Sequence, residues 1–282
     1  MARRPRVARR PRVVLLAAVL TVGACDSAQD PPILTDPHEI VTAAAASTAA
    51  LSTVHAQIDL TGTNGGRAED LIRFRLETDI DVQERNVAGR LQMTQGDPPA
   101  RAPETSEFVI LDQATFSRTG DAPSWFMSNR GGDQLPTIAA YLGLIERAIG
   151  NGSAVLALAD ETSCGPGTCY HVSAALNAEA SWLLLVAPLV GRPADPAVAP
   201  PADMVPTPAT VELYVDQKTR LLAGVEGAFS IQGTAVAFSL SFSNHDAPIR
   251  ITASPPHLID DPNQGGGISP APTAVTLAPP SP

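Results

Sequence analysis

The sequence is missing the signatures by which many enzymes are recognised. It has no GxSxG nucleophile elbow, no HExxH zinc motif, no GxxxxGK[ST] phosphate loop and no dinucleotide-binding glycine run after a strand. The five histidines are scattered along the chain, at His38, His55, His171, His245 and His257. We therefore expect a protein that is not an enzyme, with no catalytic residues, no cofactor and no metal site.

Long apolar runs and basic residues are also scarce. A membrane-spanning helix needs about 20 apolar residues, and the apolar run at 13–24 is shorter than that. The chain has 19 basic and 29 acidic residues, and six of the basic ones are arginines within residues 3–12. Without that stretch the balance is 13 basic to 29 acidic residues. A surface this acidic repels nucleic acid, which we exclude as a partner.

The first 25 residues predict an export signal. An arginine-rich start followed by a short apolar run is typical of signal peptides, and Val22-Gly23-Ala24-Cys25 resembles the lipobox of bacterial lipoproteins. That resemblance implies removal of residues 1–24, acylation of Cys25 and a lipidated tether at 25–36. The protein would then lie on the extracytoplasmic face of the cell membrane. The alternative is an ordinary secreted protein with an incidental cysteine near its cleavage site.

The other two cysteines, Cys164 and Cys169, enclose the turn-forming stretch Gly165-Pro166-Gly167. Strand-like pieces stand on both sides, at 155–160 and 169–176. The spacing fits a disulfide that closes the tip of a hairpin in an oxidising compartment. The alternative is a pair of reduced cysteines in a loop.

The remainder of the chain alternates between helical and strand-like periods. A helix is predicted from Pro37 to Leu51, with Asp36 as its cap. From Val54 the period changes to two, which predicts a meander of half-buried antiparallel strands with one apolar and one charged face. The segment at 108–118 is more continuously apolar, and SWFMS follows at 124–128.

Two further helices are predicted, at 135–149 and at 177–187, the second capped by Asn177. Residues 191–208 are too rich in proline for a regular element and are expected to form a long mobile connection. Three more strands follow it. From about residue 257 the tail is rich in proline and glycine, so 257–282 is expected to be disordered.

These elements predict one α+β domain at 37–256. Two of the helices come between strands of a mostly antiparallel set. A single sheet with this many strands tends to curl or close, and the three helices need an apolar concave face on which to pack.

The order of these elements resembles the LppX/LprA/LprF/LprG lipoprotein family of actinobacteria, whose fold is like that of the carrier LolA and the sensor RseB. The resemblance lies in the lipobox, in "LSTVHAQIDLTGT", in "FVILDQATFSRTGDAPSWFMS", and most of all in the ending "SNHDAPIRITASPP". It implies a curved, unclosed antiparallel β-barrel with helices plugging its mouth. It also implies an apolar cavity that holds acyl chains of lipids or lipoglycans. The cysteine pair and the long tail depart from the family pattern.

The apolar strand positions and the plug helix supply the candidate cavity lining. The residues are Ile58, Leu60, Phe74, Leu76, Leu91, Ile138, Leu142, Ile145, Phe238 and Leu240. For each of them taken singly, a place in a solid core is the simpler interpretation, so the hypothesis concerns the set.

Two functions remain open at the level of sequence. The first is a membrane-anchored carrier that binds a lipid or glycolipid, with a membrane transporter or signalling protein as a further partner. The second is a sensor or accessory lipoprotein, similar to RseB, that binds a membrane protein and transports nothing. The same fold serves both.

Overall fold

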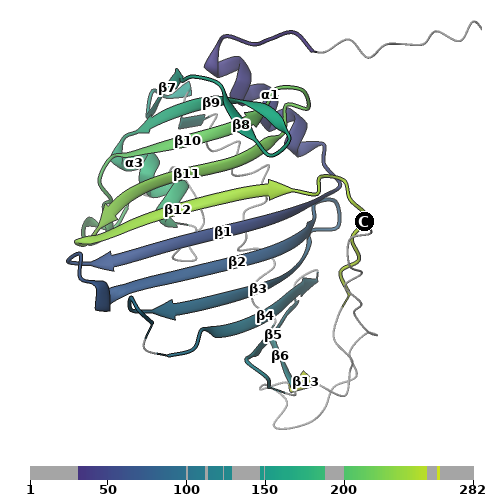
Figure 1. The fold of residues 1–282 in the computed structure, drawn as a ribbon, viewed down its shortest axis with the longest axis vertical. Helices are drawn as coiled ribbons and strands as arrows, with labels where there is room; N and C mark the ends of the chain where they lie inside the picture. The colour runs from purple at the N-terminus through teal and green to yellow at the C-terminus, as the bar shows by residue number, and fades with distance from the viewer. Residues whose placement is uncertain are drawn as a thin grey trace, which may run out of the picture. The chain divides into compact units, whose positions relative to one another are not determined.

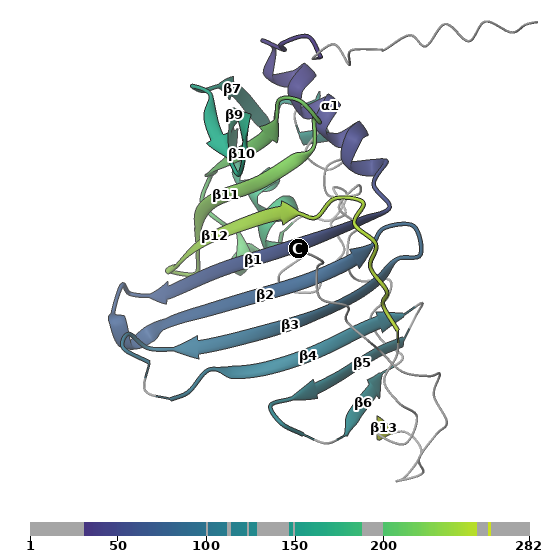
Figure 2. The ribbon, with the colours of Figure 1, turned by 45° about the vertical axis from the view of Figure 1, so that its right-hand side comes forward.

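The alternating residues of the sequence form one curved antiparallel sheet (Figure 1, Figure 2). All the elements below belong to a unit that begins at Pro32. The computed structural model describes residues 31–99, 101–111, 114–122, 124–128, 147–148, 150–187, 200–252 and 259–260.

Thirteen strands make up the sheet within these residues. They are β1 (Thr53–Asn64), β2 (Leu71–Asp81), β3 (Asn86–Gln95), β4 (Glu104–Leu111), β5 (Ala114–Thr119), β6 (Trp125–Ser128), β7 (Ala154–Leu158), β8 (Thr162–Cys164), β9 (Gly167–Leu176), β10 (Ala209–Asp216), β11 (Leu222–Ile231), β12 (Thr234–Ser243) and β13 (Ile259–Asp260). Their order is β13-β6-β5-β4-β3-β2-β1-β12-β11-β10-β9-β7, with β8 paired to β9. The pair β13–β6 is parallel and the other pairs are antiparallel. The two ends of this order, β13 and β7, are not paired with each other, so the sheet is open.

The first and last long strands meet in the middle of the sheet. β1 pairs with β2 on one side and with β12 on the other, so Ile58 lies opposite both Leu76 and Leu240. This contact between segments about 180 residues apart in the chain joins the two halves of the sheet into one continuous surface.

Helices cover one half of the apolar face. α1 (Pro37–Ala49) begins at the cap Asp36, whose side chain accepts a hydrogen bond from the His38 backbone N–H. α3 (Ala178–Ser181) begins at Asn177, which caps the Ala180 N–H at 2.8 Å, and continues as a wider π-helical turn at 182–186. Together they pack on β9, β10 and β11 around Trp182, which is almost fully buried.

A smaller cluster lies on the opposite face of the sheet. It contains Ala88, Val109, Phe116 and Trp125, with Ile251 packed against it. Ile251 belongs to the chain that leaves β12 and descends past the ends of β1–β5 in both views (Figure 1, Figure 2). This segment begins with Asp246, whose N–H donates to the Thr53 carbonyl oxygen at 2.9 Å.

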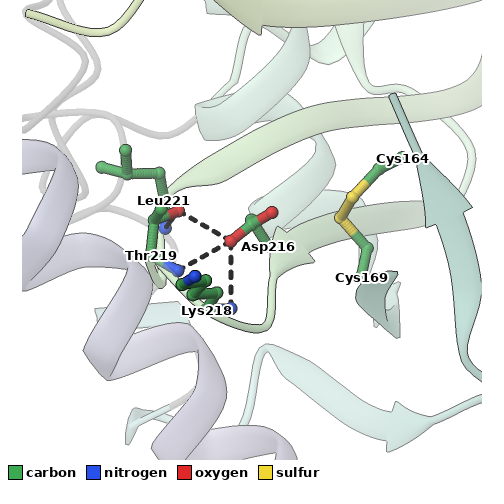
Figure 3. Close-up of a disulfide and its surroundings, with 6 residues drawn as sticks. All are labelled: Cys164, Cys169, Asp216, Lys218, Thr219 and Leu221. Carbon is green, nitrogen blue, oxygen red and sulfur yellow. Dashed lines mark hydrogen bonds between the residues drawn. A yellow bond between two sulfur atoms is a disulfide. The ribbon is translucent and has the colours of Figure 1, made fainter. Parts of the chain in front are cut away.

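The disulfide expected from the cysteine spacing is present between Cys164 and Cys169, with a Cα–Cα distance of 5.7 Å. It closes the β8–β9 hairpin beside the β10–β11 turn (Figure 3). In that turn Asp216 accepts hydrogen bonds from the Lys218 and Thr219 backbone N–H groups at 3.0 and 2.7 Å. The Gln217 N–H donates to the Thr168 carbonyl oxygen at 3.0 Å, so the two turns are joined.

The α+β class and the unclosed antiparallel sheet are confirmed. The helix count differs, because among the described residues the α-helices are α1 and α3, together with a π-helical turn at 182–186, short 3-10 turns and a few helical residues near 147. Of the helix predicted at 135–149, only 147–148 are described, and they are helical. No helix of the described part of the chain is long and apolar enough to cross a membrane.

Three segments differ in detail from the prediction. The apolar stretch 108–118 contains two strands, β4 and β5, which pair with each other from Leu111–Ala114 outward. Within the expected disordered tail, Ile259 and Asp260 pair with β6. Of the connection 191–208, residues 200–208 are described, and they include a short 3-10 turn at Ala202–Met204.

Two leucines on one cross-strand row allow a test of where the core lies. Leu213 on β10 is 1% exposed, whereas Leu158 on β7 is 41% exposed. Leu213→Ala should lower the free energy of unfolding by about 2–5 kcal/mol, because it leaves a cavity among packed side chains. Leu158→Ala should lower it by about 1 kcal/mol or less. Urea unfolding of the two variants measures both changes, and equal losses would contradict this position of the core.

Candidate functional site

The apolar face of the sheet continues beyond the helix-covered half. All seven described candidate lining residues lie on this face and are neighbours in register. One row runs Leu240–Ile58–Leu76–Leu91, and the next runs Phe238–Leu60–Phe74–Met93. The remaining three candidates, Ile138, Leu142 and Ile145, lie outside the described residues.

The same rows extend into the core. Leu240 lies opposite Val225, which lies opposite Leu213, which lies opposite Val172. Val172, Leu213 and Val225 are buried under the helices, whereas Ile58, Leu76 and Leu91 are only half-buried. One face thus forms a packed core over β9–β11 and a partly covered apolar surface over β1–β3.

Burial of this surface changes along the strands. At the end where β1 begins, Val54 is 1% exposed. At the other end of the same face, Ile72 and Met93 are each 36% exposed. The apolar face is therefore closed at the Thr53 end and open at the Asn64 end.

Among the residues of this face that sequence reasoning left out of the candidate lining are Ile72, Met93 and Phe108. Ile72 and Met93 alternate in phase with Phe74 and Leu91, so the period of two already placed them on this face. Phe108 was harder to place, because the residues from Phe108 to Leu111 are all apolar and show no period. Its register opposite Gly89 puts it on the apolar face.

Glycines make room for the phenylalanine rings on this face. A Cβ placed on Gly89 would lie 2.7 Å from the Phe108 ring and 2.7 Å from the Glu77 carbonyl oxygen. A Cβ on Gly227 would lie 2.8 Å from the Phe238 ring. Each ring therefore lies over a glycine of the neighbouring strand, close to the backbone.

The opposite face of the sheet carries charged side chains as well as the smaller apolar cluster, and several of the charges form ion pairs. His55 Nδ1 lies 2.8 Å from Asp79 Oδ1, and Arg118 Nη2 lies 2.5 Å from Glu107 Oε2. A hollow of about 350 Å³ lies at the Asn64 end of β1, where β11 and β12 also meet. It combines the hydroxyls of Thr61, Thr63, Thr207 and Ser230 with apolar side chains, and none of the candidate lining residues takes part in it. The apolar members are Ala228, Phe229, Ala235, Val236 and Ala237.

One polar cluster combines residue types that occur in hydrolases. His171 Nε2 lies 2.8 Å from Glu212 Oε2, and the Ser173 hydroxyl donates to Glu212 Oε1 at 3.1 Å. The carboxylate thus stands between the serine and the histidine, whereas a nucleophilic serine needs the histidine as its direct partner. The Tyr214 ring stacks on His171 at 5.0 Å between centroids, and its burial beside Glu226 and Glu212 raises the pKa of Tyr214. The cluster therefore gives Ser173 no activating base.

Among the described side chains, no group of three or more histidines, cysteines or carboxylates could hold a metal ion. The two described cysteines are joined to each other in the disulfide.

The glycine–phenylalanine contacts can be tested with a matched glycine. Gly89→Ala should destabilise the fold by about 1–3 kcal/mol, because the new methyl group collides with the backbone of β2 as well as with Phe108. Gly62, on β1 of the same face, has only the Thr234 methyl carbon within reach, at 3.8 Å. Gly62→Ala should therefore change stability little. Thermal unfolding of both variants measures the difference, and the same effect at both positions would argue against this packing.

Comparison with known proteins found similarity among solved structures. No protein-family model matches the sequence, and no curated protein matches it. The chain is similar to lipoprotein LppX of Mycobacterium tuberculosis, with 14% identity and a TM-score of 0.45 over 77% of this chain and 98% of that one. It is also similar to LprF of Mycobacterium bovis, with 12% identity and a TM-score of 0.49 over 79% and 99%. A LolA superfamily protein of Nitrosomonas europaea matches with 11% identity and a TM-score of 0.24 over 79% and 96%. These are proteins of the kinds that the sequence resembles, and at this level of similarity function has to be inferred from the chain's own residues.

Proposed function

We propose that this protein is a membrane-anchored lipoprotein that holds acyl chains of a lipid or lipoglycan on its apolar face and carries or presents them in the cell envelope. The main observation in support is the continuity of the two rows across β12, β1, β2 and β3. They place eight apolar side chains side by side on a surface that remains partly accessible.

The energetics of acyl chains suit such a surface. Each methylene removed from water contributes about 0.8 kcal/mol, so twelve methylenes contribute roughly 10 kcal/mol without any polar contact. Neighbouring strands lie about 4.8 Å apart, so four adjacent strands offer a band about 14 Å wide. Half-buried leucines and phenylalanines on this band leave area that a ligand can still cover.

Binding without catalysis is part of the proposal. The arrangement at Glu212 supports it, since the carboxylate accepts hydrogen bonds that would otherwise link Ser173 to His171.

Native mass spectrometry tests the ligand class. The mature protein from a bacterial periplasm should show adducts of lipid mass that are lost on denaturation. Leu60→Asn places an amide in the apolar row and should weaken binding by about 5–150-fold, the equivalent of 1–3 kcal/mol. Thr61→Asn, on the same strand but on the polar face, is the control and should bind as the parent does.

The alternative is an accessory lipoprotein that binds a membrane protein and no lipid. A parent protein that shows no adduct, even after incubation with envelope lipids, would refute lipid binding and favour this alternative. Equal adducts in the two asparagine variants would refute the position of the site on the apolar face.

The anchor is tested separately from the ligand. We propose that Cys25 is acylated and attaches the protein to the extracytoplasmic face of the membrane, because the acidic surface offers no attraction to anionic lipids. Cys25→Ala should move the protein from the membrane fraction to the soluble fraction. Membrane extraction followed by immunoblotting measures this, and a processed variant that stays in the membrane fraction would show that Cys25 is not the anchor.

A further inference from the structure

The chain just before α1 is held at one point, which we call the N-terminal clamp and define as Pro32, Leu34, Tyr170 and Arg220. The Arg220 guanidinium donates to the Pro32 carbonyl oxygen and, at 2.5 Å, to the Tyr170 hydroxyl. The Leu34 N–H donates to the same hydroxyl at 2.8 Å. The guanidinium also lies over the Tyr170 ring, 5.0 Å from its centroid, where a cation is attracted to the aromatic face.

The unusual backbone conformation of Arg220 indicates that an arginine side chain is needed at this position. Its φ is +63°, in the left-handed region that favours glycine or asparagine. The turn around it is held by Asp216, to which the Lys218 and Thr219 N–H groups donate (Figure 3). In this conformation the Arg220 guanidinium reaches the Pro32 carbonyl oxygen and lies over the Tyr170 ring.

The clamp lies at one end of the sheet, which we call the clamp end. Tyr170 follows the disulfide residue Cys169 on β9, and Arg220 lies in the β10–β11 turn. The strand pairing from β9 through β10, β11 and β12 to β1 places the start of β1, where Val54 is buried, at this same end of the sheet. Over β1–β3 the apolar face is therefore closed at the clamp end, and the exposed residues Ile72 and Met93 lie at the other end.

Chain length restricts how far the clamp end can be from an anchor at Cys25. Seven residues, 25–31, precede Pro32, and a fully extended chain spans at most about 3.6 Å per residue, or about 25 Å. β1 alone has 12 residues, which at about 3.4 Å each separate the two ends of the sheet by about 40 Å. Beside the clamp, Ile33 is 72% exposed, an apolar side chain on the segment nearest the anchor.

We infer that the anchored protein stands with its clamp end against the lipid bilayer and the open end of its apolar face directed away from it. The inference rests on the proposed anchor at Cys25. The bilayer surface is the partner of the clamp end, with Ile33 as its apolar contact. Ligand then enters and leaves on the side facing the envelope, toward an acceptor other than the anchoring membrane.

Fluorescence quenching at two positions tests this orientation. The full-length lipidated protein is reconstituted into phosphatidylcholine vesicles that contain a headgroup-linked quencher. A thiol-reactive fluorophore is placed at Lys218→Cys in the β10–β11 turn or at Asn64→Cys at the opposite end, both exposed positions. We expect several-fold stronger quenching at position 218 than at position 64.

Clamp variants provide the control. Tyr170→Phe removes the hydroxyl that accepts from Leu34 and Arg220 but keeps the ring, and Arg220→Gln removes the guanidinium. Either change should reduce the difference between the two labels without reducing the lipid adducts seen by native mass spectrometry.

The outcomes separate the inference from the proposed function. Equal or reversed quenching on vesicle-bound protein would overturn the orientation, while the anchor and the lipid site would stand. Protein that does not bind the vesicles at all would overturn the anchor and the orientation with it. A difference that persists unchanged in both clamp variants would overturn the role of the clamp.

Discussion

An open antiparallel sheet with one apolar face cannot bury that face against itself, and the arrangement of this protein follows from that constraint. Over β9, β10 and β11 the face is covered by α1 and by the helical residues around Trp182. Over β1, β2 and β3 the rows continue with side chains that are only half-buried. A single alternation in the sequence therefore produces both a stabilising core and a surface with area left for an apolar ligand. The core and the half-buried surface lie on different strands of one sheet, and the cross-strand rows run from one to the other.

Most of what the sequence predicted depends on short-range periodicity. Val54, Ala56, Ile58 and Leu60 alternate with polar residues. A period of two places these four side chains on one face of a strand, so the same alternation predicts both the strand and its buried face. The Asn177 cap and the spacing of Cys164 and Cys169 are equally local signals. For this reason the α+β class, the strand meander and the disulfide agree with the structure.

What the sequence could not show depends on long-range contacts or on runs without a period. The apolar residues from Phe108 to Leu111 do not reveal which of them face which side, and the run does not show that the segment holds two paired strands. Val109 belongs to the apolar cluster on the opposite face of the sheet, where Ile251, far away in the chain, packs against it. The Arg220 guanidinium donates a hydrogen bond to the carbonyl oxygen of Pro32, which lies 188 residues earlier in the chain. No local sequence pattern indicates such a contact.

The edge strand β7 has a consequence for how the protein behaves in concentrated solution. In the described part of the chain β7 pairs only with β9, and its residues Ala154–Leu158 include no charge and no proline. Val155 is 66% exposed on it. Such an edge is a template for strand pairing between molecules. The acidic excess opposes this by mutual repulsion. Because salt shortens the range of that repulsion to about 10 Å at 0.1 M, pairing between β7 edges of different molecules becomes easier as the ionic strength rises.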